Sequence, residues 1–252
     1  MVYGLWHSAA GLQAQQYRQA VISNNLANAS TPGFKPDRIA FQERLSASRA
    51  GASLGPRHPT LDALTGGLFA TPVYTDYTPA GSVPSANPFD VSINGDGFLS
   101  VRMSEGMRYT RDGRLIMDKD GTLRHVASGG AMVDAAGRPI VLDPASHAPV
   151  KIDASGRVRQ GESIAGQLAV VDFEDREALE KEGHNLSSGA KARSVSADGQ
   201  VRQFSTEASG VDPVTTLVEM ITASRAYETN AAMLSMQNDT LGRAVNEVGR
   251  LG

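Results

Sequence analysis

A heptad repeat fills the C-terminal forty residues of this chain and limits the folds that it can adopt. From Asp212 onward, apolar and small side chains recur every three and four residues for more than four heptads. A period sustained over that length predicts a coiled-coil seam rather than an ordinary surface helix. Asp212 suits an N-cap and Pro213 suits the first helical position, so we expect the helix to begin there. One seam position holds Leu217, Ser224, Ala231, Asn238 and Val245, and the other holds Met220, Tyr227, Leu234, Leu241 and Val248.

A second helix is expected at the other end of the chain, over residues 1 to about 29. Its apolar stripe is narrow because glutamines interrupt it. The pattern stops at Ser30-Thr31-Pro32-Gly33, where proline disfavours helix in the preceding residue and glycine accepts a positive φ. Lys35 and Arg38 follow this stop. They are expected either to pair with Glu43 or with another subunit, or to lie in a solvated loop.

Each terminal helix carries a seam that needs cover, and pairing the two helices is the simplest way to provide it. Both seams also contain small residues and amides, which weaken packing in an isolated pair. Two arrangements therefore stay open. The helices form an intramolecular hairpin, or they are completed by neighbouring subunits.

The middle of the chain reads as an extended linker followed by a β body. Residues 46–88 hold six of the twelve prolines and few charges, which makes helix improbable and predicts a connecting stretch. From Phe89 the pattern alternates, and Asn-Gly or Asp-Gly pairs beginning at positions 94, 112, 120 and 198 predict hairpin turns. Residues 175–182 are expected to form one short helix on this body, with Arg176 and Glu180 at helical spacing.

The predicted fold class is α+β. The N- and C-terminal helices pair as a coiled-coil-like stalk, and an extended linker leads to a central, mostly antiparallel β domain. The expected boundaries are residues 1–35 and 210–252 for the helical domain, 36–88 for the linker, and 89–209 for the β domain.

Composition and motifs argue against the common catalytic, cofactor-binding and metal-binding sites. The chain has no cysteine, which removes thiolate catalysis and cysteine-based metal sites, and its five histidines lack ligand spacing. Asn94-Gly95-Asp96-Gly97 lacks the third glycine of a dinucleotide loop, and Asp118-Lys119-Asp120-Gly121 lacks the final acidic ligand of a calcium loop. We therefore predict no catalytic residues, no cofactor and no metal site.

Charge and hydropathy also limit the partners. The formal net charge is -3 and no segment is strongly basic, which argues against nucleic-acid binding. No stretch approaches the ~20 apolar residues that span a bilayer, so we expect no direct membrane insertion. The N-terminus lacks the basic region and unbroken apolar run of a cleaved secretion signal.

Several stretches of the chain form long, specific motifs. Residues 12–16 and 22–35, which end in Ser30-Thr31-Pro32-Gly33-Phe34-Lys35, resemble the N-terminal signature of the flagellar rod and hook family nearly residue for residue. Residues 90–98 and 109–113 resemble the opening of its central β domain, and residues 183–186 with 188–189 are also similar. Residues 217–221 and 225–230 resemble its C-terminal helix. The likeness spans nearly the whole chain.

The resemblance implies a subunit that polymerises helically around a central channel, with terminal helices forming the inner tube and β domains the outer wall. The implied partners are copies of itself, other flagellar rod proteins and the flagellar type III export apparatus. The implied location is the flagellar basal body, extracytoplasmic, after export without leader cleavage. Length favours a rod protein over the hook protein, and the short stretch 190–210 favours a proximal-rod over a distal-rod type.

The expected assembly interface combines the two seams with the amides late in the first helix. Asn24, Asn25 and Asn28 are read as inter-subunit hydrogen-bonding groups, with helix-end capping as the alternative. The interface comprises Leu5, Leu12, Ile22, Asn24, Asn25, Leu26, Asn28, Leu217, Met220, Ile221, Tyr227, Ala231, Leu234, Leu241 and Val245. Two other functions remain as alternatives: a monomeric β-domain module that binds a ligand while the helices brace it, and, third, an enzyme. The acidic run 172–182 is read as a solvated face, with partner binding or channel lining as its alternative.

Overall fold

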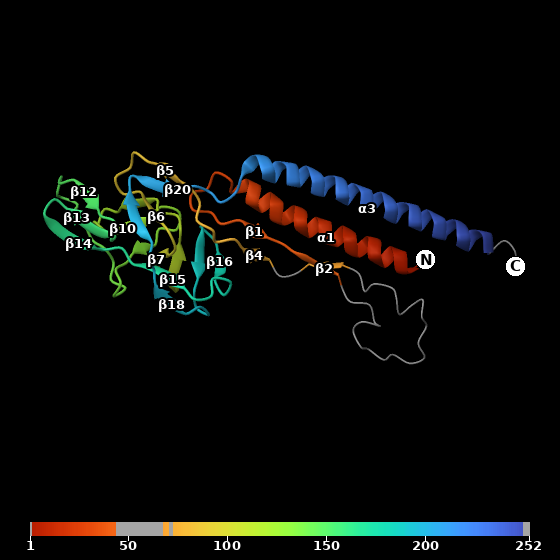
Figure 1. The fold of residues 1–252 in the computed structure, drawn as a ribbon, viewed down its shortest axis with the longest axis horizontal. Coiled ribbons are helices and arrows are strands. Elements are labelled where there is room, and N and C mark those ends of the chain that lie inside the picture. Colours follow the sequence, from red (N-terminus) through yellow and green to blue (C-terminus); the bar gives the residue numbers. More distant parts are fainter. Residues whose placement is uncertain (1, 44–67, 71–72, 249–252) are drawn as a thin grey trace. The chain divides into compact units, whose positions relative to one another are not determined.

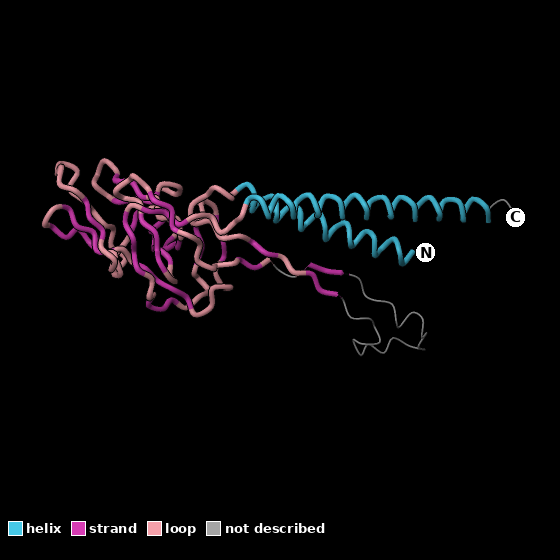
Figure 2. The backbone as a smooth tube through the Cα atoms, turned by 45° about the horizontal axis from the view of Figure 1, so that its top comes forward, coloured by secondary structure: helices cyan, strands magenta, loops and turns pink. Residues whose placement is uncertain are grey.

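The computed structural model describes residues 2–43, 68–70 and 73–248. The chain divides into two compact units, each assembled from stretches that are distant in sequence. The first, the helical unit, takes in Met1–Ala27, Asp37–Tyr74 and Pro213–Gly252, and the second, the β unit, takes in Asn28–Pro36 and Thr75–Asp212. Figure 2 distinguishes the two long helices from the strands of the β unit by colour.

The helical unit is built on α1 (Val2–Ala27) and α3 (Pro213–Val248), which lie side by side and antiparallel (Figure 1). The α3 helix begins at Pro213, as predicted from the Asp212-Pro213 pair. The α1 helix ends at Ala27, two residues before the expected limit, a difference within the usual scatter of helix ends. The predicted α+β class with paired terminal helices is confirmed.

Short strands complete the helical unit. They are β1 (Asp37–Arg38), β2 (Phe41–Glu43), β3 (Leu68–Ala70) and β4 (Tyr74–Thr75), where β1 pairs with β4 and β2 with β3. The expected linker therefore contains strand pairs. Its residues 44–67 and 71–72 lie outside the described part of the chain. Asn25 ties β1 to α1, because its amide donates to the Asp37 carbonyl at 2.8 Å and accepts from the Asp37 N–H at 3.0 Å.

The β unit is an antiparallel body, as predicted. Its main sheet runs β16-β17-β8-β7-β11-β10-β9, and β15 joins β7 and β18. A second sheet has the order β12-β13-β14, and two pairs join β19 to β6 and β20 to β5. Its strands are β5 (Ser82–Pro84), β6 (Val91–Asn94), β7 (Phe98–Met103), β8 (Gly106–Thr110), β9 (Leu115–Met117), β10 (Leu123–His125), β11 (Ala131–Met132), β12 (Val150–Ile152), β13 (Arg157–Gln160), β14 (Ser163–Gln167), β15 (Val170–Phe173), β16 (Glu180–Glu182), β17 (Leu186–Ser188), β18 (Ser194–Ser196), β19 (Gln200–Gln203) and β20 (Ser205–Glu207).

The core of the β unit is aliphatic, as its low aromatic content requires. Inward residues of β6, β7, β9, β10 and β13 form one buried cluster with loop residues such as Ile140 and Leu142. Alternation places Val91 and Ile93 in this cluster along β6. A smaller aromatic cluster holds Tyr77, Phe98, Phe173 and Leu179.

Two local predictions for the β body were wrong. Residues 174–179 form a turn, and β16 follows, where a short helix was expected. The helical charge spacing was misleading, since Arg176 pairs with Asp172 and Asp96 while Glu180 pairs with Lys191. Most of the predicted hairpin turns were also wrong. Of the four Asn-Gly or Asp-Gly pairs, only Asp120-Gly121 joins strands that pair with each other, β9 and β10; the pairs beginning at positions 94, 112 and 198 lie between strands that do not. Gly113 instead meets a different constraint. It packs so closely on the Val91 carbonyl that a Cβ would collide with that oxygen.

Candidate assembly interface

The seam between α1 and α3 is built from glycines, hydroxyls and amides. Gly4 of α1 packs against the amide of Gln237, and Gly11, one heptad later, packs against the amide of Asn230. Ser8 Oγ donates to Gln237 Oε1 at 3.2 Å. The absent side chains at the two glycines leave holes that the long amides fill, which brings the two helices together through polar knobs.

Because amides fill these holes, one of the two predicted seam positions of α3 is displaced. Met220, Leu234 and Leu241 lie half-buried on the α1 side, as the repeat predicted. The other row is shifted back by one residue, to Thr216, Ala223, Asn230, Gln237 and Ala244, which are buried or half-buried. In the predicted row, Leu217, Asn238 and Val245 are exposed, whereas Ala231 is half-buried and Ser224 Oγ accepts a hydrogen bond from Gln19 Nε2 of α1 at 3.0 Å. Leu217 and Val245 were assigned to the seam because they are apolar, but they lie on a face of α3 that α1 does not cover.

The remaining predicted interface residues separate by burial. Ile22 and Asn25 are buried, and Leu5, Leu12, Leu26 and Ala231 are half-buried. Asn24 and Tyr227 are exposed, and Asn28 is half-buried in the β unit, where its carbonyl accepts from Ser209 Oγ at 2.9 Å. The bonds of Asn25 to Asp37 lie within one chain and give that amide an intramolecular role.

The α3 apolar face consists of Val214, Leu217, Val218 and Ile221 at the start of the helix. These side chains are 72%, 49%, 58% and 48% exposed. Their spacing of three and four residues puts them on one side of α3, away from the row that contacts α1. Scattered exposed apolar residues are ordinary, but a contiguous stripe on one helix face marks an interaction surface.

The exposed side of α1 is also unusual, because none of its residues carries a charge. Trp6 is 73% exposed, and the other exposed residues recur at heptad spacing. They are Trp6, Ala9, Gln13, Gln16, Tyr17, Ala20, Ser23, Asn24 and Ala27. A solvated helix face normally carries charged residues. An uncharged face of small, amide and aromatic residues can approach another helix without desolvating ions.

Both chain segments that lead into the helices are anchored inside the β unit. We call residues 28–36 together with 205–212 the neck. The Gly33 N–H donates to the Glu207 carbonyl at 2.9 Å, and the Gly210 N–H donates to the Phe34 carbonyl at 2.8 Å. Lys181 adds a cation–π contact, its Nζ lying 4.7 Å from the centre of the Phe34 ring.

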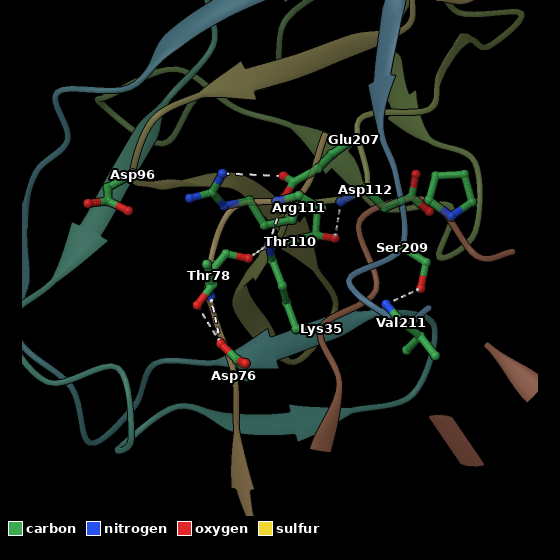
Figure 3. A network of polar contacts seen from close by, with 12 residues as sticks. Lys35, Asp76, Thr78, Asp96, Thr110, Arg111, Asp112, Glu207, Ser209 and Val211 are labelled. Carbon is green, nitrogen blue, oxygen red and sulfur yellow. Dashed lines mark hydrogen bonds and ion pairs between the residues drawn. The ribbon is translucent and has the colours of Figure 1, made fainter. Parts of the chain in front are cut away.

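A buried ion cluster lies at the centre of the neck (Figure 3). Glu207 Oε1 accepts from Lys35 Nζ at 2.6 Å, and its Oε2 lies 3.3 Å from Arg111 Nη1. All three side chains are almost fully buried. Lys35 also donates to the Thr78 carbonyl, and Glu207 accepts from the Ala80 N–H. Burial lowers the pKa of Lys35 and of Arg111 from their ordinary values, although Glu207 acts against both shifts.

This cluster corrects the expectation for Lys35, which pairs with Glu207 rather than with Glu43. Sequence reasoning missed Arg111 and Glu207 as anchoring residues. Lys35 and Arg111 do fall within two of the stretches that resemble the rod family, residues 22–35 and 109–113, and that resemblance was the available signal. No feature of the sequence indicated Glu207, because 172 residues separate it from Lys35.

The turn at Gly33 offers a direct test of the neck. Gly33 has φ 67°, and a Cβ there would collide with the Arg111 carbonyl. We expect Gly33→Ala to lower the free energy of unfolding by about 1–3 kcal/mol from backbone strain alone, and by more from the collision. Gly183→Ala is the control, because its Cβ would meet open space. Urea unfolding should separate the two variants, and equal midpoints would contradict this account of the turn.

A second buried carboxylate predicts acid sensitivity. Burial of Asp112 would raise its pKa, but contacts with His125 and Arg114 outweigh burial and hold that pKa below its usual value. A lowered folded-state pKa stabilises the fold above about pH 4, and the stabilisation is lost as pH falls further. The difference in unfolding free energy between the wild type and Asp112→Asn should therefore shrink between pH 7 and pH 3. A difference that stays constant would contradict the assignment.

Within the described residues, no helix is long and apolar enough to cross a membrane. The chain matches three family profiles in sequence. "Flagella basal body rod protein" covers residues 5–35, "Flagellar hook protein FlgE/F/G D1 domain" covers 92–160, and "Flagellar basal body rod FlgEFG protein C-terminal" covers 202–247. These ranges contain α1 with the start of the neck, part of the β unit, and α3.

Whole-chain relatives agree with the profiles. The flagellar basal-body rod protein FlgF of Caulobacter vibrioides is 31% identical over 92% of this chain and 91% of its own length. The rod protein FlgG of Buchnera aphidicola subsp. Acyrthosiphon pisum is 32% identical over 96% and 98%. That of Bacillus subtilis is 30% identical over 98% and 99%. The FlgF and FlgG relatives match about equally, so the proximal-rod type remains a prediction. With a paired-helix unit, an antiparallel β body and full-length relatives of this kind, the chain belongs to the flagellar basal-body rod protein family.

Proposed function

We propose that this chain is a structural, non-enzymatic subunit of the bacterial flagellar basal-body rod, and that it polymerises helically through its terminal helices into part of the hollow drive shaft. The α3 apolar face carries this proposal. After α1 has covered one side of α3, Val214, Leu217, Val218 and Ile221 still face solvent. A monomer would gain nothing from that exposure, whereas a polymer buries it.

The helix pair alone is a weak structure, which favours completion by neighbours. Its seam uses two glycines and two amides where a stable coiled coil uses leucine and isoleucine. A helical polymer needs contacts that do not close into a ring, so each surface meets a different surface of the next copy. The α3 apolar face and the uncharged face of α1 provide two such surfaces on one unit. In this proposal the two arrangements left open by the sequence coexist. The helices form an intramolecular pair, and neighbouring subunits complete that pair.

The partners and location follow from this role. The relatives carry the name of flagellar basal-body rod proteins, which supports assembly with copies of this chain and with other rod proteins. Passage through the flagellar type III export apparatus, without leader cleavage, to an extracytoplasmic position in the basal body completes the proposal. Within the rod we favour the proximal position, on the shortness of residues 190–210.

Imaging of basal bodies tests this function. In a strain lacking the gene, we expect a rod that stops at the level where this subunit belongs, and full-length protein should restore it. A variant lacking α3 should be exported but should not restore the rod. Intact rods and normal swimming in the deletion strain would overturn the proposal. They would favour the alternative of a ligand-binding β module, which should stay active without the helices.

A further inference from the structure

The exposed face of the β12–β14 sheet carries a row of like charges, which we call the basic row. Lys151 lies directly opposite Arg159, and Arg159 lies opposite Ile164 on the next strand. All three are exposed, Ile164 at 59%. Like charges directly opposite on paired strands destabilise a sheet. Neither cation has an ion-pair partner in the described part of the chain, so the chain itself does not compensate this arrangement.

The turn between β15 and β16, residues 174–179, presents the opposite charge, and we call it the acidic turn. Asp175 and Glu177 are exposed, and no described residue forms an ion pair with either. Arg176 lies between them in sequence but turns back to its own unit, its Nη2 lying 2.7 Å from Asp172 and 3.1 Å from Asp96. It therefore leaves the two outward carboxylates uncompensated.

The acidic turn is fixed in place by its last residue. Leu179 is buried with Phe98 and Phe173 in the aromatic cluster. The Asp175 carboxylate also accepts the Glu177 N–H at 2.9 Å, which sets the local geometry. A turn held in this way presents its charges in one orientation, so binding costs little ordering entropy.

The basic row and the acidic turn cannot meet within one chain. Both belong to the β unit, where β12–β14 lie at one end and β16 at the other (Figure 1). Two cations at one end and two carboxylates at the other suit a head-to-tail contact between copies. Such a contact joins unlike surfaces and does not close on itself, which matches a helical polymer.

We propose that the basic row of one subunit binds the acidic turn of a second copy of this chain. Lys151 and Arg159 pair with Asp175 and Glu177 of the next copy, and Ile164 packs beside the turn. The contact rests on the proposed polymerisation and adds an interface between β units to the interface between helices. It also explains why the sheet keeps two opposed cations that destabilise the isolated fold.

Charge exchange tests the pairing. Lys151→Glu with Arg159→Glu should impair rod assembly and swimming, and so should Asp175→Lys with Glu177→Lys. Each reversal should lower subunit association by roughly tenfold, which corresponds to about 1.4 kcal/mol. The quadruple variant should regain swimming, since its charges are complementary again. A matched reversal at two exposed cations elsewhere in the β unit, Lys119→Glu with Arg202→Glu, should have no effect, since neither cation has an ion-pair partner among the described residues.

Cross-linking tests proximity without removing any of the four charges. The chain has no cysteine, so Ile164→Cys and Ala178→Cys introduce the only thiols. In swimming cells, a short bis-maleimide should link the double variant into a ladder of several subunits. Each single variant should give at most dimers, because one thiol cannot propagate a head-to-tail chain.

The outcomes separate this contact from polymerisation itself. Rescue by the quadruple variant, or a ladder, supports the contact. Normal swimming of both reversed pairs, or assembled rods that contain the double-cysteine subunit and give no ladder, would overturn it while leaving the proposed function intact. If the double-cysteine variant fails to assemble, the charge exchange decides the question alone. Failure of the proposed function would show in the deletion strain, as rods that do not need this subunit.

Discussion

Replacement of Glu207 by glutamine should lower the free energy of unfolding of the β unit by about 3–5 kcal/mol. The neck buries two cations, Lys35 and Arg111, on this single carboxylate. Without it both buried cations lose the carboxylate with which they form hydrogen bonds. Lys35 can respond by losing its proton, since burial already lowers its pKa. Arg111 has no such escape, because a guanidinium keeps its charge at any ordinary pH. Urea unfolding of the full chain measures the loss.

Lys35→Met is the matched control for this prediction. It removes one of the two cations and leaves Glu207 with Arg111 and the Ala80 N–H. The variant loses the hydrogen bonds of Lys35 Nζ to Glu207 and to the Thr78 carbonyl, and a bond made by a charged group is worth about 1.5–3 kcal/mol. It leaves no buried charge without a partner, so we expect a smaller loss than for Glu207→Gln. The order of the two variants is decisive. Equal destabilisation by Lys35→Met and Glu207→Gln would contradict the claim that Glu207 stabilises the fold by balancing the buried positive charge.

The double variant Leu217→Asp with Ile221→Asp should abolish rod assembly and swimming while the isolated chain stays folded. Both side chains are about half-exposed, so the monomer loses little packing. In the polymer the same positions would bury two carboxylates against apolar side chains. Loss of two apolar contacts alone is worth about 3 kcal/mol or more, which corresponds to over a hundredfold in association.

Two controls place this effect on the α3 apolar face. Ser235→Asp with Asn238→Asp adds the same charge at exposed polar positions of α3 and should swim normally. Leu234→Asp lies on the α1 side and should instead lower the helix content of the monomer, as seen by circular dichroism. Normal swimming of the Leu217 and Ile221 double variant would remove the α3 apolar face from the assembly.

The sequence predicted the secondary structure well where the signal was local. Helical period and the Asp212-Pro213 pair located the start of α3 to the residue, and alternation of apolar and polar residues predicted the antiparallel body. It misplaced part of one of the two seam rows of α3, because Gly4 and Gly11 make holes that Gln237 and Asn230 fill. The heptad assignment had placed the apolar residues Leu217 and Val245 in the seam instead of these amides. The misassigned Leu217 identifies a second surface, because it belongs to the exposed α3 apolar face.

Long-range polar contacts could not be predicted from one sequence. Nothing near Lys35 indicates that its counterion lies beyond the β body, at Glu207. The acidic segment misled for a related reason. Arg176 and Glu180 have helical spacing, but Leu179 is drawn into the aromatic cluster and Arg176 into contacts with Asp172 and Asp96, which shape a turn. Tertiary contacts outweighed a local helix signal.

Thiol labelling at Val218 tests polymerisation through the helices most directly. In this cysteine-free chain, Val218→Cys provides a single probe at a position 58% exposed in one subunit. We predict rapid reaction with maleimide in the purified monomer and strong protection in isolated rods. Ser235→Cys, at an exposed position outside the α3 apolar face, should react at similar rates in both. Labelling of the Val218→Cys variant in assembled rods as fast as in the monomer would contradict the account.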